Sequence, residues 1–252
     1  MASAADTGET VVVVRRHRAR TAAKWTGIAL LSILLLIGAF LVWLNTDPGR
    51  RFVVNQINSF EAASGLNVRV GRIEGSVFGE MTLVDIAISD PRGVFFRARS
   101  AEISYRPLSY FRNHIDIRSL IIPEARLHRL PELRPGDPNA PLLPDINVDI
   151  GRFRIGRLLI DPAVTGQRHL LTLDSRAKIA DGRAQVALDA GTIAAPGLAG
   201  GDRMALRLDA VPEANRFDVN VGLRGPGNGF IAGMLGVDRP VAAQIEGRGD
   251  WA

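Results

Sequence analysis

The feature that most constrains this chain is an uncharged apolar run, WTGIALLSILLLIGAFLVWL, from Trp25 to Leu44. Its polar side chains are those of Thr26 and Ser32. As a helix the run would extend roughly 30 Å, which matches the hydrocarbon thickness of a bilayer. A cleaved signal peptide is disfavoured because no A-x-A site follows the run, and a buried soluble helix would normally be shorter and carry a polar stripe. The sequence therefore predicts a transmembrane anchor over 25–44.

Charged residues on either side of this run predict its orientation. The basic tail 1–24 carries more positive charge than the residues directly after Asn45. Because Lys and Arg concentrate on the cytoplasmic side of an anchor, we expect a cytoplasmic N-terminus and a single pass, with the bulk of the chain outside the cytoplasm. A tryptophan near each end of the run fits the interfacial preference of indole rings. The expected membrane-contacting residues are Trp25, Leu30, Leu35, Phe40 and Trp43.

The composition narrows the function classes. The formal net charge is +5, lysine occurs only at Lys24 and Lys178, and there is no cysteine. The absence of cysteine rules out disulfides and thiolate metal sites. Beyond the tail, arginines alternate with acidic residues and aromatic residues are few, which argues against a nucleic-acid partner.

A short amphipathic helix is predicted within 45–65. Asp47 is its expected N-terminal cap, Pro48 is expected at the first helical position, and Gly65 is its expected C-terminal end. Its apolar residues follow a helical period: Val53, Ile57 and Phe60. Such a helix would lie on the membrane surface or cover one end of the sheet that follows, and the second is favoured because a strand begins at once.

From residue 66 onward the apolar residues alternate with a period of two, as in strands with one buried face. A first β segment, 66–130, is followed by a Pro-rich excursion over 131–144 and by a second β segment, 145–252. Asp181-Gly182 predicts a tight hairpin between two strands of the second segment. The pattern indicates a long antiparallel sheet that is buried on one side only.

The apolar face of such a sheet needs a cover, and two are possible. The ordinary one is a second sheet, or the same sheet curled shut, which gives a closed sandwich or barrel core. The other is an incompletely closed trough that accepts lipid acyl chains. The alternation alone favours the closed core. Two features weaken that preference. The apolar residues of the strands are mostly aliphatic, with few aromatics, and no helix beyond 45–65 is predicted to cap the sheet.

No arrangement in the sequence predicts an active site. Ser76 directly follows Gly75, so 75–79 departs from the G-x-S-x-G elbow. The Gly-rich stretch 225–229 has Phe230 where a dinucleotide motif needs its third glycine. Beyond the tail the histidines lack metal-ligand spacing, and each is expected at a strand edge or in a loop: His114, His128 and His169. We therefore expect no enzyme activity, no cofactor and no metal.

Four parts of the chain carry a resemblance to a known family. They are the N-terminal anchor, the stretch TDPGRRFVVNQI after it, Gly71–Ser76 with Leu83–Pro91, and the Pro-rich stretch with Asp145–Gly151. Together they are similar to the N-terminal part of the TamB family, the inner-membrane subunits of the translocation and assembly module of Gram-negative bacteria, within the wider AsmA-like group. The likeness covers nearly everything after the basic tail.

The resemblance implies a fold and a function. TamB-like proteins are similar to a long, tightly curled periplasmic sheet with a hydrophobic groove. The expected fold is therefore mainly β: an anchor helix, a short amphipathic helix and an elongated, curled antiparallel sheet that forms a taco-like trough. The family is implicated in phospholipid transport toward the outer membrane, which implies a bacterial inner-membrane protein with a largely periplasmic chain. The expected lipid-groove lining is Val84, Ile86, Ile88, Leu171, Leu173, Val186, Leu188, Leu206, Leu208, Phe217, Val219, Val221 and Leu223.

The resemblance also implies a partner and an alternative function. Family members are thought to engage an outer-membrane barrel, TamA, through a C-terminal domain. They are several times longer than this chain, which ends at Trp251-Ala252 just after a predicted strand, so we expect a partial chain without that domain. The alternative is a scaffold that helps outer-membrane proteins such as autotransporters to insert, by pairing strands at its sheet edges.

Overall fold

The computed structural model describes residues 31–62, 64–135, 143 and 146–249. The chain divides into two units at Leu44, and each is described by itself. In the first unit, the described residues are α-helical from Leu31 to the boundary. Its side chains Leu35, Phe40 and Trp43 are exposed.

The predicted anchor is only partly covered by these residues, because Trp25 and Leu30 lie outside them. No single helix in the described ranges has the length and hydropathy of a membrane span. Residues 31–44 and the helix that follows them meet the criterion together, as a pair interrupted by a short break. The anchor therefore stays a prediction.

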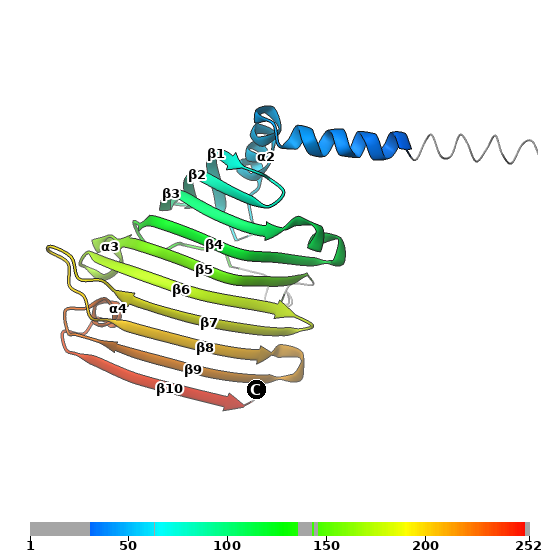
Figure 1. The fold of residues 1–252 in the computed structure, drawn as a ribbon. Coiled ribbons are helices and arrows are strands. Elements are labelled where there is room, and N and C mark those ends of the chain that lie inside the picture. Colours follow the sequence, from blue (N-terminus) through cyan, green and yellow to red (C-terminus); the bar gives the residue numbers. More distant parts are fainter. Residues whose placement is uncertain (1–30, 63, 136–142, 144–145, 250–252) are drawn as a thin grey trace, which may run out of the picture. The chain divides into compact units, whose positions relative to one another are not determined.

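The described residues of the second unit are mainly β, with ten strands in one sheet that follow the order of the chain (Figure 1). The strands are β1 (Asn67–Gly75), β2 (Glu80–Asp90), β3 (Gly93–Arg106), β4 (His114–Leu127), β5 (Asn147–Ile160), β6 (His169–Ala180), β7 (Arg183–Thr192), β8 (Arg203–Val211), β9 (Arg216–Gly225) and β10 (Val241–Gly249). The helices are α2 (Asp47–Ser59), η1 (Pro107–Arg112), α3 (Pro162–Thr165), η2 (Pro212–Ala214) and α4 (Phe230–Leu235).

The sheet is mixed, so the prediction of a wholly antiparallel sheet is wrong at one place. β4 and β5 pair in parallel, with Ile122 opposite Ile155. The reason is the connection over 128–146, which returns the chain to the starting end of β4. Parallel neighbours need a crossover of about a dozen residues or more, and this Pro-rich segment is long enough to supply it.

The sheet is also open, whereas the resemblance led us to expect a tightly curled trough. β1 and β10 are its two edges, and they do not pair with each other. Alternation in the sequence fixes which residues share a face of a strand. It carries no comparable signal for how strongly the sheet bends from strand to strand, so the curl rested on the resemblance alone.

A local kink in β2 makes the predicted position of Val84 wrong. Asp85 adopts a left-handed conformation (φ 57°), and alternation shifts by one residue there. Leu83, Ile86 and Ile88 pack in one apolar cluster as a result. Leu83 therefore takes the place that the pattern assigned to Val84, which lies opposite Ser100 on β3.

α2 covers the β1 end of the sheet, as the sequence predicted. Val54 of α2 packs against Val70, Ile73 and Val77 in a buried cluster. The helix ends earlier than expected, with Phe60 as its C-cap residue. The predicted terminal residue, Gly65, lies instead in the turn before β1, with φ 82°.

Candidate functional site

The strands β6 to β9 align their apolar residues into one continuous face. Leu188 lies opposite Leu206, which lies opposite Val221. The next row, Val186, Leu208 and Val219, runs parallel to it. The predicted lining residues of these strands therefore share one face: Leu171, Leu173, Val186, Leu188, Leu206, Leu208, Phe217, Val219, Val221 and Leu223. We call this surface, together with the residues in register with it, the apolar face.

The apolar face is most exposed toward β10. Ile245 continues the row of Val221 and is 55% exposed. Leu206 and Val221 are only partly buried. In contrast, Ile155 of β5 is 5% exposed, in the main apolar cluster of β2 to β5. Burial therefore falls from the centre of the sheet toward its β10 edge.

The β7–β8 connection and the start of α4 meet around a buried carboxylate. Asp202, between β7 and β8, is 1% exposed. Its Oδ2 accepts hydrogen bonds from Thr192 Oγ1 (2.8 Å) and the backbone N–H of Phe230 (2.9 Å), and its Oδ1 accepts from Ile231 N–H (3.0 Å). The carboxylate thus ties the start of α4 to the β7–β8 connection, and we call this arrangement the Asp202 clasp.

His169 lies beside the clasp and differs from its predicted position at a strand edge or in a loop. It is the first residue of β6, pairs with Ile160, and is 1% exposed. Its ring meets the ring of Phe230 edge-on, with 5.7 Å between centroids. Burial lowers the pKa of His169, and the charge of Asp202 opposes that shift in part. The imidazole is therefore neutral at pH 7.

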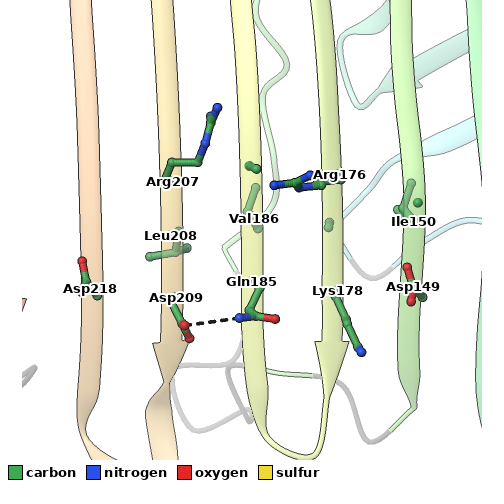
Figure 2. Close-up of a pocket in the computed structure, with 13 residues that line it drawn as sticks. Asp149, Ile150, Arg176, Lys178, Gln185, Val186, Arg207, Leu208, Asp209 and Asp218 are labelled. Atoms are coloured by element: carbon green, nitrogen blue, oxygen red, sulfur yellow. Dashed lines mark hydrogen bonds between the residues drawn. The ribbon is translucent and has the colours of Figure 1, made fainter.

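The opposite face of β5 to β9 is charged and has a shallow hollow (Figure 2). Figure 2 shows acidic and basic side chains interleaved along neighbouring strands. The hollow has a volume of about 430 Å³. Its charged lining residues are Asp149, Arg176, Lys178, Arg207, Asp209 and Asp218.

Several charges of this face pair with one another. Arg183 holds the pKa of the Asp209 carboxyl below its usual value, so that carboxyl is ionised at neutral pH. Arg207 donates to Asp189 at 2.8 Å. Within the described residues, no group of three or more acidic or histidine side chains could hold a metal ion. The hollow therefore has the character of a solvated sheet face with interleaved ion pairs.

Two ion pairs lie where β4 ends and the parallel crossover begins, and sequence reasoning missed both: the pair of Asp90 is largely buried, and that of Asp161 is partly exposed. Asp90, with a fully buried side chain, accepts two hydrogen bonds of 2.6 Å from Arg129. Arg126 donates to both oxygens of Asp161, and His128 Nδ1 lies 2.9 Å from the same carboxylate. Arg129 and Arg126 hold the pKa of Asp90 and that of Asp161, respectively, below the usual value. These partners lie far apart in the sequence, so no local motif announces them.

The comparisons with known proteins leave the site to be judged from its own chemistry. No protein-family model, no curated protein and no solved structure matches this chain. The apolar face offers many weak, non-directional contacts, which suit aliphatic chains rather than a polar small molecule. Non-covalent binding of apolar chains is what the geometry favours.

Proposed function

We propose that the apolar face holds the acyl chains of phospholipid and that the protein, anchored in the inner membrane, passes lipid toward the outer membrane in the manner of TamB-like proteins. The observation that supports the proposal best is the register of Leu188, Leu206 and Val221, which continues one partly exposed aliphatic row into β10. The receiving partner in this proposal is an outer-membrane barrel of the TamA type.

The energetics of an open apolar sheet suit a passive carrier. Covering apolar surface gains about 25 cal/mol per Å², so each ~100 Å² of contact contributes ~2.5 kcal/mol. Several such contacts along one row hold an acyl chain. The acyl chain can move from one row to the next without a large barrier, because each contact is weak. A headgroup pocket is not needed for retention in this scheme.

Photo-crosslinking in the full-length chain tests the proposal. A photoreactive amino acid replaces Val221 on the apolar face, or its neighbour Asn220, which faces the opposite side beside Glu246. We expect phospholipid adducts at position 221 in cells and few at position 220. Equal capture at the two positions, or no lipid at 221, would overturn the proposal.

A charged residue placed in the row provides a second test of the proposal. Leu206→Glu should reduce lipid capture at position 221. An acyl chain that covers the row would have to displace the water around an ionised carboxylate, which costs free energy. Ala205→Glu is the matched control: it adds the same group one residue away on the same strand, with Arg203 and Arg207 on either side along the charged face. It should leave capture unchanged.

A second function has its own supporting observation, the outer edge of β10. β10 pairs with β9 on one side, and on the other side no described strand pairs with it. An incoming strand of an outer-membrane protein could add there by β-augmentation. If the protein acts as such a scaffold, Leu206→Glu should leave its scaffold function unchanged. A crosslinker at Glu246 should then capture protein rather than lipid.

A further inference from the structure

The connection between β3 and β4 presents bare apolar side chains to solvent. η1 carries Leu108, Tyr110 and Phe111, which are 75%, 68% and 86% exposed. Single exposed apolar residues are common on protein surfaces. A leucine and two aromatic side chains exposed together on one six-residue segment are a less common feature, which calls for an explanation. We call this cluster the η1 tip.

The η1 tip is held by the strands on either side of it. Arg106, before η1, donates to Asp116 of β4 at 2.9 Å. Asn113 closes η1 in a left-handed conformation, with φ 55°. Its carbonyl accepts a 3.0 Å hydrogen bond from the N–H of Asn147, which joins the loop to β5. The tip is thus a supported projection, and its apolar side chains stay exposed despite this support.

The tip lies at the end of the sheet where the predicted anchor joins the second unit. The side chain of Asn45, one residue after the apolar run, accepts from Val77 N–H at 3.1 Å and donates to Ser76 Oγ at 3.2 Å. The β1–β2 turn that contains these residues is bonded in turn to the end of β3, because Tyr105 N–H donates to Gly79 O at 3.1 Å. η1 begins two residues after Tyr105. In Figure 1 it is the green turn at the end of β3.

We infer that the η1 tip is a second membrane contact, which inserts into the bilayer interface beside the anchor. Leu108 and Phe111 suit the acyl boundary, and the amphipathic ring of Tyr110 suits the headgroup level. Arg112, the exposed last residue of η1, would reach lipid phosphates. The inference rests on the membrane anchoring in the proposed function. It adds that the β3–β4 end of the sheet is held at the membrane surface.

A lipid surface explains this combination better than a protein partner does. The side chains form a small projection with a cation at its base, which matches an interfacial anchor more closely than a flat docking patch. Its place beside the anchor junction would put it within reach of the same bilayer. Two attachments would orient the sheet relative to the membrane, which a single attachment does not do.

The cysteine-free chain makes the test specific. Phe111→Cys in the full-length protein gives one labelling site for an environment-sensitive fluorophore. The labelled protein is reconstituted into vesicles of phosphatidylethanolamine and phosphatidylglycerol. We expect a blue shift, protection from iodide in the buffer and quenching by lipid-attached quenchers. Met234→Cys in α4 is the matched control, since Met234 is an apolar residue that is also exposed (46%), but near the Asp202 clasp. Its label should remain in water.

A label at Phe40→Cys separates the failure of the tip from the failure of the anchor. If the label at 40 is in lipid while the label at 111 stays open to iodide, the inference is wrong and the anchor stands. If both remain in water, the anchor and the inference fall together. If the label at 111 is protected from iodide but unaffected by lipid quenchers, a protein contact covers the tip and the membrane assignment is wrong.

Discussion

The Asp202 clasp gives the sharpest prediction about stability. Asp202→Ala removes three hydrogen bonds to a buried carboxylate, those from Thr192, Phe230 and Ile231. The two backbone N–H groups at the start of α4 then lose their acceptor. The space around the carboxylate is tight, because a Cβ built at Gly229 would lie 2.5 Å from Asp202 Oδ1. The truncated side chain leaves a polar gap that neighbouring atoms do not fill.

The magnitude follows from the kind of bonds that are lost. Hydrogen bonds to a charged group contribute about 1.5–3 kcal/mol each, and their losses within one network do not add fully. We expect Asp202→Ala to destabilise the α4 segment by about 3–5 kcal/mol. Since every ~1.4 kcal/mol is tenfold in an equilibrium constant, local opening should increase about 10²- to 10⁴-fold.

Hydrogen exchange measured on the full-length protein in detergent checks this expectation. The amides of Phe230 and Ile231 should exchange faster in Asp202→Ala, while those in the centre of β7 keep their protection. Asp218→Ala is the control, because Asp218 pairs with Arg248 at the surface, with the two side chains 49% and 83% exposed. Such pairs contribute about 0–1 kcal/mol. Equal protection of α4 in the two variants would refute the clasp as a stabilising element.

Two further predictions concern buried groups. Ile73→Ala should cost about 2–5 kcal/mol, because Ile73 is 5% exposed under α2, and urea unfolding of the variant should show a lower midpoint with α2 losing protection first. His169 should make stability depend on pH: the unfolded state binds a proton as pH falls through about 6.5, whereas the buried imidazole has a lowered pKa and stays neutral. Stability should therefore drop as pH falls below that value and level off below the folded-state pKa. His169→Gln should remove this drop, and an unchanged difference between unfolding midpoints at neutral and mildly acidic pH would contradict the assignment.

Local sequence signals were sufficient where one strand follows another through a short turn. Asp181 and Gly182 adopt left-handed conformations (φ 51° and 68°), as the hairpin prediction requires. Alternation then carries the register from β6 to β9, so the shared face of Leu188 and Leu206 could be predicted. The amphipathic period of α2 identified Val53 and Ile57, which pack at β1, but it missed the buried Val54 and wrongly included Phe60, which is 69% exposed.

Long-range pairings could not be predicted in this way. Whether β5 pairs with β4 in parallel depends on the path of 128–146, and only its length and proline content are visible in the sequence. The kink at Asp85 shifts alternation without changing the residue pattern, which misplaced Val84. Asp202 lies in a Gly-rich loop, where an aspartate ordinarily indicates a turn. Its role depends on α4, which is distant in the sequence.

The gradient of burial across the sheet decides where the lipid proposal can be tested. Leu171 is 5% exposed, so a carboxylate there would unfold the local core and any loss of lipid would be uninformative. Leu206 lies in the same face but is only partly buried, so a carboxylate at that position can reach water with modest strain. A loss of lipid in Leu206→Glu with an unchanged unfolding midpoint can then be assigned to the surface itself. If Leu206→Glu instead unfolds as a Leu171→Glu variant does, the β6–β10 part of the face is a closed core in solution, and the lipid proposal loses its basis.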